Sequence, residues 1–158
     1  MNATVQWKEN MTFVGVPDSG IPVQMDADSL FGGTNSGIRP MEMIVLGLAG
    51  CTGMDVISIL RKKHQQVTHL EVQVNAPRSA EYPKVFTSGL ITYIVTGKNI
   101  EEAAVLRSIE LSATKYCPVH FMLAQVFPIE MHYEIYEEEE AGSRRLTSQG
   151  TWQELPIE

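Results

Sequence analysis

Residues 39–64 read RPMEMIVLGLAGCTGMDVISILRKKH, and this stretch decides the fold because it predicts one long helix. Pro40 suits the first helical position, and the carboxylate of Glu42 lies in the first turn, where it meets the positive end of the helix dipole. The cationic residues at positions 61–64 carry the charge that a helix C-terminus favours. We therefore expect a helix over residues 40–64.

This helix is expected to be hydrophobic nearly all round. Between Met41 and Leu60 the charged residues are Glu42 and Asp55. A membrane span is the alternative, but two carboxylates, three glycines and strand-rich flanks argue against it. The favoured interpretation is a central helix buried inside a globular protein.

Three glycines give the helix an unusual face. Gly47, Gly50 and Gly53 recur every three residues, so they lie near one side of the helix. A glycine inside a helix costs about 1 kcal/mol relative to alanine. Close approach of another backbone would offset that cost, and each chain has one such helix. The sequence therefore predicts a homodimer in which two copies of this helix pack together.

The rest of the chain alternates between strand and helix patterns. A period of two predicts strands over residues 4–8, 11–16, 21–25, 69–76, 85–96 and 129–135. Helices are expected over residues 99–116, with Asn99 as N-cap, and over 118–125 after the Cys117-Pro118 break. These patterns predict an α+β fold of order βββ-α-ββ-αα-β, with the long helix packed on antiparallel sheets.

The domain organisation follows from the same patterns. Residues 1–136 are expected to form a single domain, and residues 137–158 an acidic, polar C-terminal tail that begins with a run of four Glu. We find no internal repeat that would divide the chain further.

Composition excludes several kinds of partner. The net charge is −7 and hydrophobic residues make up 44% of the chain, which is typical of a globular protein with no affinity for nucleic acid or an anionic membrane. Two cysteines are too few for a disulfide scaffold. Residues 1–10 lack the pattern of a signal peptide, so we expect the reducing cytoplasm, where a disulfide would take part in chemistry.

The two cysteines are the candidates for that chemistry. Cys51 lies in the middle of the apolar helix, with Asp55 one turn away on the same face. Cys117 precedes Pro118, so it can cap a helix N-terminus, where the dipole lowers the pKa of a thiol. By this local argument Cys117 is the more acidic thiol. For both residues a packing role stays open, because free cysteine is among the most buried residue types.

Neither a metal nor a cofactor is expected. Cys117-Pro-Val-His120 has the spacing of half a zinc site, but the other histidines form no second pair. The sequence contains no Walker loop, no G-x-G-x-x-G and no G-x-S-x-G motif.

The paired cysteine motifs resemble the OsmC/Ohr family, in particular its OsmC-like branch. The resemblance is carried by residues 41–61, around Gly-Cys51-Thr-Gly-Met-Asp55, and by residues 111–119, around Lys-Tyr-Cys117-Pro-Val. The expected order of strands and helices agrees with the family over residues 1–136. The resemblance implies an intertwined homodimer with two long central helices.

The resemblance also implies an activity. In peroxidase members a hydroperoxide oxidises the cysteine that matches Cys51 to a sulfenic acid, the cysteine that matches Cys117 resolves it as a disulfide, and a dithiol reduces that disulfide. We therefore expect thiol-dependent reduction of organic hydroperoxides in oxidative stress defence. The alternative is a non-enzymatic dimer that binds a small apolar or acyl ligand at the subunit interface, and a purely structural oligomer is a third possibility.

Two departures from the peroxidase pattern concern the supporting residues. Peroxidase members have a glutamate directly after the proline, whereas here Met41 intervenes and Glu42 points about 100° further round the helix. They also use an arginine from an N-terminal loop, and Arg39 lies about 18 Å along a straight helix from Cys51 at about 1.5 Å per residue. We expect Arg39 and Glu42 to be structural or interfacial, or to serve a partner chain, and Asp55 is the third candidate for a supporting role.

Overall fold

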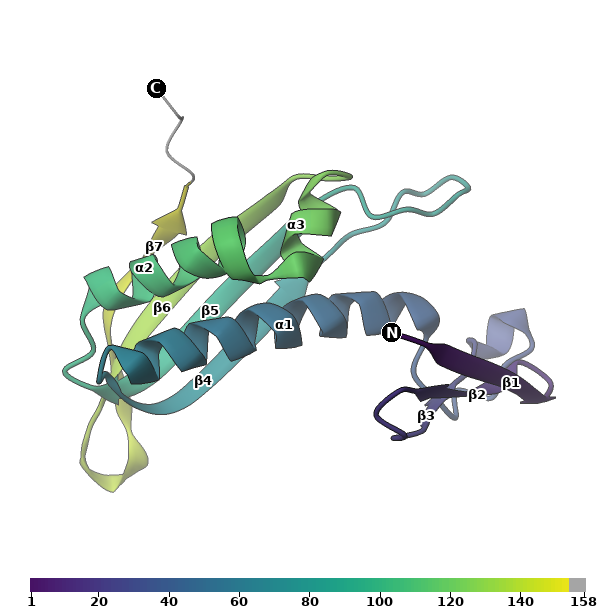
Figure 1. Ribbon diagram of the computed structural model, residues 1–158, viewed down its shortest axis with the longest axis horizontal. Coiled ribbons are helices and arrows are strands. Elements are labelled where there is room, and N and C mark those ends of the chain that lie inside the picture. The colour runs from purple at the N-terminus through teal and green to yellow at the C-terminus, as the bar shows by residue number, and fades with distance from the viewer. Residues whose placement is uncertain (154–158) are drawn as a thin grey trace. The chain divides into compact units, whose positions relative to one another are not determined.

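The computed structural model describes residues 1–153, and the chain divides into two compact units, Met1–Ile44 and the part from Val45 onward. Figure 1 labels the helices and strands of both units. The architecture is α+β, as predicted, with two sheets and a long helix.

The first unit is built on the predicted meander. Strands β1 (Ala3–Glu9), β2 (Thr12–Pro17) and β3 (Val23–Met25) form an antiparallel sheet in the order β1-β2-β3. Asn10 makes the turn between β1 and β2 at a φ of 46°, in the left-handed region that asparagine tolerates. A short 3₁₀ helix, Ser29–Phe31, lies in the loop that follows β3.

Helix α1 (Pro40–Lys62) begins at the predicted proline and ends two residues before the predicted end. His64 then takes a φ of 56°, a left-handed conformation that ends helices. Within the second unit every fourth residue of α1 is buried: Leu48, Thr52, Val56 and Leu60. The sequence predicted a helix buried on all sides, but within one chain these four residues are the fully buried ones of α1.

The second unit has a four-stranded sheet in the order β4-β5-β6-β7. Its strands are β4 (Gln66–Asn75), β5 (Gly89–Lys98), β6 (Ile129–Glu138) and β7 (Arg144–Trp152). The expectation of antiparallel sheets is wrong for the central pair, because β5 and β6 are parallel. The helical segment between these two strands returns the chain to the end of the sheet where β5 began, which makes the next strand parallel.

That crossover consists of three helical pieces. Helix α2 (Glu102–Leu111) runs into a π-helical turn, η2 (Ser112–Tyr116), and helix α3 (Pro118–Ala124) follows after Cys117. Figure 1 shows α1 and α2 side by side over the same sheet. The core lies between them and the sheet, with Val56, Tyr93, Val105 and Ile135 among its members.

Two local predictions are wrong. Asn99 is not the cap of α2, because Glu101 occupies the N-cap and Asn99 has a φ of 51°. Most of the expected tail, residues 137–158, is not a tail, because β6 extends to Glu138 and β7 pairs antiparallel with β6 up to Trp152, while residues 154–158 lie outside the described residues. The polar sequence of β7 reflects its exposed face, whereas Trp152 packs against the core.

Helix α1 is long and apolar enough to cross a membrane by length and composition. Core helices of globular proteins meet the same criterion, and the face of α1 that carries Leu48, Val56 and Leu60 belongs to the hydrophobic core.

Candidate functional site

The two cysteines meet inside the second unit. Cys51 is half-buried in the middle of α1, and Cys117 lies 2% exposed at the N-cap of α3. Both are free thiols, and they lie close enough for the side chain of Cys51 to act on the pKa of Cys117. Residues 66 positions apart in the sequence are thus brought into contact by the packing of the crossover on α1.

Cys117 is held by its own helix start, as Pro118 predicted. Its sulfur accepts a hydrogen bond from the backbone N–H of His120, with an N···S distance of 3.3 Å. Its own backbone N–H donates to the carbonyl oxygen of Ser112 at 2.9 Å, which closes the π-helical turn. π-helical turns are rare and occur frequently at functional sites.

Burial raises the pKa of Cys117 well above the ordinary value of a thiol. The capping N–H of His120 acts in the opposite direction but does not overcome burial, and the neighbouring Cys51 and the charge of Asp55 raise the pKa further. The prediction that Cys117 is the acidified thiol is therefore wrong, because the cap dipole is outweighed by desolvation.

The two thiols have unequal surroundings. The side chain of Cys51 raises the pKa of Cys117, in addition to the effect of burial. Cys51 is also the more exposed of the two sulfurs. Burial and the neighbouring Cys51 therefore both disfavour a thiolate on Cys117.

A chain of hydroxyl groups lies next to the cysteines. The Thr52 Oγ1 is 2.5 Å from the Tyr93 hydroxyl and 2.9 Å from the Ser112 Oγ. All three residues are at most 1% exposed. We call Thr52, Ser112 and Tyr93 the hydroxyl network. Sequence reading did not identify it, although a threonine on the apolar face of a buried helix was a signal.

Asp55 connects the hydroxyl network to the surface. Its Oδ2 accepts a hydrogen bond from the Ser112 Oγ at 3.0 Å. The side chain is half-buried and lines an open pocket of about 250 Å³ together with Lys62 and Tyr116. The structure therefore places Asp55 beside the cysteine pair, close enough for its charge to act on Cys117.

A second pocket, of about 270 Å³, reaches Cys117. It is lined by Lys115 and Tyr116 from the π-helical turn and by Pro118, Phe121 and Met122 from α3. Phe121 and Met122 are exposed, so the entrance to this pocket is apolar with one cation beside it.

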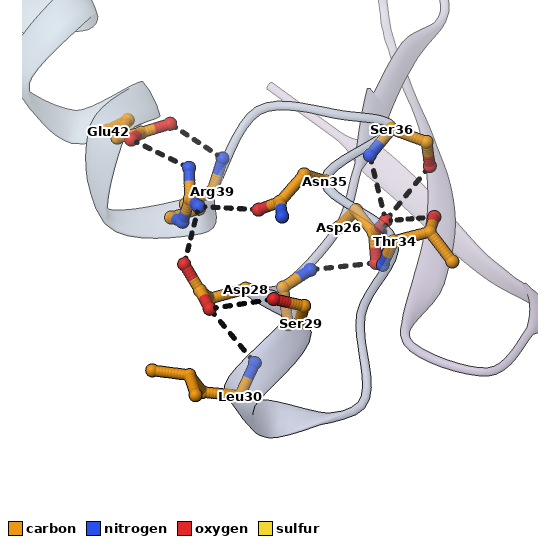
Figure 2. Close-up of polar contacts among 10 residues, drawn as sticks. Asp26, Asp28, Ser29, Leu30, Thr34, Asn35, Ser36, Arg39 and Glu42 are labelled. Atoms are coloured by element: carbon orange, nitrogen blue, oxygen red, sulfur yellow. Dashed lines mark hydrogen bonds and ion pairs between the residues drawn. The ribbon is translucent and has the colours of Figure 1, made fainter.

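Arg39 and Glu42 lie in the first unit and contact each other. Figure 2 shows the Arg39 guanidinium donating to the Asn35 Oδ1 at 2.7 Å, to the Asp28 Oδ2 at 3.2 Å and to the Glu42 Oε1 at 3.3 Å. The backbone N–H of Arg39 also donates to Glu42, at 2.9 Å. These bonds hold Arg39 and Glu42 together at the start of α1.

Asp26 fixes the same loop from within. It is 3% exposed and accepts a hydrogen bond from the backbone N–H of Ala27. It also accepts hydrogen bonds from Thr34 and Ser36, whose side chains Figure 2 shows beside its carboxylate. The bonds from Ser36 and Thr34 hold the pKa of Asp26 well below its usual range. Sequence reading gave this aspartate no role.

Within residues 1–153 no group of three or more His, Cys, Asp and Glu side chains could hold a metal ion. His120 places its Nδ1 3.2 Å from the carbonyl oxygen of Ala113. The spacing of Cys117 and His120 therefore reflects the start of α3.

Comparison with known proteins gives consistent matches. The family model described as OsmC-like protein matches residues 33–132. Protein YhfA of Escherichia coli is 40% identical over 135 residues, which cover 85% of this chain and 98% of that protein.

Solved structures agree with this. A hypothetical protein from Aquifex aeolicus is 26% identical, with a TM-score of 0.76 over 87% of this chain and 97% of its own. An organic hydroperoxide resistance protein from Legionella pneumophila is 13% identical, with a TM-score of 0.59 over 85% of this chain and 94% of its own, and shares the fold.

Proposed function

The chain belongs to the OsmC-like protein family, and we propose that it reduces organic hydroperoxides with Cys51 as the attacking thiolate and Cys117 as the resolving thiol. The observation that carries this proposal is the neighbouring thiol pair, in which Cys117 is buried and Cys51 is half-buried. Relatives of the same fold that are named organic hydroperoxide resistance proteins support the choice of reaction.

The first step is oxidation of Cys51. Its thiolate attacks one peroxide oxygen, the O–O bond breaks, and the other oxygen leaves as an alcohol after it takes up the proton that the thiol gave up. The products are a sulfenic acid on Cys51 and one alcohol. Burial disfavours a thiolate on Cys117, which leaves Cys51 the role of attacking sulfur in this proposal.

The second step is resolution. The sulfur of Cys117 attacks the sulfur of the sulfenic acid, the S–O bond breaks, and the hydroxyl leaves as water with the proton of Cys117. A dithiol then reduces the disulfide by two thiol exchanges and becomes a cyclic disulfide itself. The apolar pocket at Cys117 gives such a reductant access to the sulfur of this residue.

The proposal includes a homodimer in the cytoplasm that serves oxidative stress defence. Leu46 and Met54 on α1 are 61% and 73% exposed, and a Cβ placed on Gly47 or Gly50 would meet nothing within 4 Å apart from the adjoining part of α1 itself. A second copy packed on this face would cover the exposed apolar side chains.

Single cysteine variants test the proposal. Under tert-butyl hydroperoxide, Cys117→Ser should accumulate a sulfenic acid on Cys51, detected as a dimedone adduct by mass spectrometry, and Cys51→Ser should react slowly. The wild type should form one intramolecular disulfide. If Cys51→Ser alone stays fast, the roles of the cysteines are reversed.

The second candidate is a dimer that binds a small apolar or acyl ligand without catalysis. One observation favours it: the guanidinium of Arg39 is held by Asp28 and Asn35 of its own loop and by Glu42 of α1, so it is not free to reach the Cys51 of its own chain. Equal peroxide consumption by the wild type and both cysteine variants would support this function and exclude the peroxidase.

A further inference from the structure

We propose that Thr52, Ser112 and Tyr93 are positioning residues that determine how closely the sulfurs of Cys51 and Cys117 approach, and therefore how readily their disulfide closes. This inference deepens the proposed function and rests on it for its place in the reaction, because the disulfide is the product of the second step. It assigns a role to three neutral residues whose hydroxyl groups form a chain in the core of the second unit.

The geometry connects both cysteines through one residue. Thr52 directly follows Cys51 in α1, and its Oγ1 is 2.9 Å from the Ser112 Oγ. Ser112 begins the π-helical turn, and its carbonyl oxygen accepts the backbone N–H of Cys117 at 2.9 Å. Ser112 therefore binds the Cys51 helix with its side chain and the Cys117 backbone with its main chain.

The protons of this chain can be placed by elimination. A carboxylate only accepts hydrogen bonds, so the hydroxyl of Ser112 donates to Asp55. Each hydroxyl has one proton, so Ser112 must then accept from Thr52, and Thr52 must accept from Tyr93. With the Tyr93 proton on Thr52 rather than on the Met131 Sδ at 3.9 Å, all three protons point toward Asp55.

The loss of one hydroxyl would disturb its neighbours. Without the Thr52 hydroxyl, Ser112 loses a donor and the Tyr93 hydroxyl is left with the Met131 sulfur at 3.9 Å. These groups are shielded from water, so no solvent molecule replaces the missing bond without rearrangement. We expect the π-helical turn to shift relative to α1, which separates the two sulfurs on average.

A glutathione redox titration measures this effect without any peroxide. The folded protein is equilibrated with mixtures of reduced and oxidised glutathione, and the fraction with an intramolecular disulfide is read by mass spectrometry after alkylation. Thr52→Val and Ser112→Ala should lower the equilibrium constant for disulfide closure about tenfold, which equals about 30 mV for a two-electron couple. Thr52→Ser keeps the hydroxyl and should restore the wild-type constant.

Ser108→Ala is the matched control. Ser108 is fully buried one turn before Ser112, but its Oγ donates to the carbonyl oxygen of Val105 in its own helix. This variant removes a buried hydroxyl without touching the hydroxyl network, so its constant should equal that of the wild type. A drop as large as that of Ser112→Ala would overturn the proposal, because any buried hydroxyl would then have the same effect.

The outcomes separate the two proposals. Wild-type constants in folded Thr52→Val and Ser112→Ala overturn the positioning role, even if the enzyme consumes hydroperoxide. A tenfold drop together with a wild type that consumes no hydroperoxide leaves the positioning role intact and overturns the proposed function. If Thr52→Val does not fold, the disulfide constants of Ser112→Ala and Tyr93→Phe test the positioning role instead. Each of these variants removes one hydroxyl group of the network and adds no bulk to the core.

Discussion

The two faces of helix α1 are almost equally apolar in sequence, but they meet different surroundings in the structure. Leu48, Val56 and Leu60 are at most 2% exposed and belong to the core, whereas Leu46 and Met54 are 61% and 73% exposed. The first face attaches α1 to its own sheet and crossover helices. The second is an apolar surface that packing within one chain does not explain, and the proposed dimer accounts for it.

The polar groups of the molecule also differ in burial between the two units. The hydroxyl network is neutral, buried and adjacent to the thiols, whereas the charged groups around Arg39 lie at a partly exposed loop. The thiol pair thus lies beside neutral hydroxyl groups and the carboxylate of Asp55.

The largest effect is expected on the buried face. Leu60→Ala should lower the free energy of unfolding by about 2–5 kcal/mol, because it leaves a cavity in a fully packed core. Urea denaturation followed by circular dichroism measures this loss. Met54→Ala removes a side chain of similar size from the exposed face, and at protein concentrations where the chain is monomeric it should leave the unfolding midpoint unchanged.

A charge on the exposed face tests the dimer. Met54→Glu should weaken self-association about 100-fold or more, because a carboxylate would be buried in an apolar interface. Sedimentation equilibrium measures the association, and Gln149→Glu, which adds the same charge on the exposed side of β7, is the control. A wild type that is monomeric at micromolar concentration would contradict the dimer itself.

Much of this fold could be predicted because its signals are local. The apolar run after Pro40 determines α1, a period of two determines the strands, and Cys117-Pro118 determines the start of α3. Strand β7 was missed because its sequence is polar on the exposed side and follows a run of glutamates. A strand at the edge of a sheet needs few buried residues, so its pattern is weak.

The candidate site was predictable only in part. Both cysteines and Asp55 stand out as residue types, but the hydroxyl network joins Thr52 to residues 41 and 60 positions away. A single threonine, serine or tyrosine is unremarkable in the sequence, and only tertiary packing brings their hydroxyls together. The predicted direction of the pKa shift of Cys117 was wrong for the same reason, since the sequence reveals the helix dipole at this residue but not its burial.

A buried charge in the first unit should have a smaller, local effect. The pKa of Asp26 is depressed in the folded state, so its contribution to stability is present above its unfolded value near 3.8 and is lost as the pH falls through the folded value. Asp26→Asn should lower the hydrogen-exchange protection of the Thr34 and Ser36 amides severalfold at pH 7, and should weaken the further loss of protection below pH 4.

The control for this measurement is Asp18→Asn, since Asp18 is exposed and lies in the same unit. It should leave the protection of the Thr34 and Ser36 amides unchanged at both pH values. Equal protection in Asp26→Asn and the wild type would show that the backbone of the loop, rather than the carboxylate, holds residues 26–38 in place.

The smallest effect is expected for Arg39→Ala, which also tests the departure from the peroxidase pattern. Arg39, Asp28 and Glu42 are each more than a third exposed, and ion pairs of this kind add little stability, so the melting temperature should fall by less than about 3 °C. Arg145→Ala, which breaks an exposed pair with Glu139, should lower the melting temperature by a similarly small amount.

The rate of Cys51 oxidation gives the second readout of Arg39→Ala. If Arg39 is purely structural, stopped-flow oxidation of Cys51 by tert-butyl hydroperoxide should be as fast in the variant as in the wild type. If Arg39 of a partner chain instead stabilises the thiolate, the rate should fall about 100-fold while the melting temperature stays within the same limit. An unchanged oxidation rate would thus indicate that Arg39 only makes contacts within its own loop. A lower rate at an unchanged melting temperature would indicate that Arg39 acts across the proposed dimer interface.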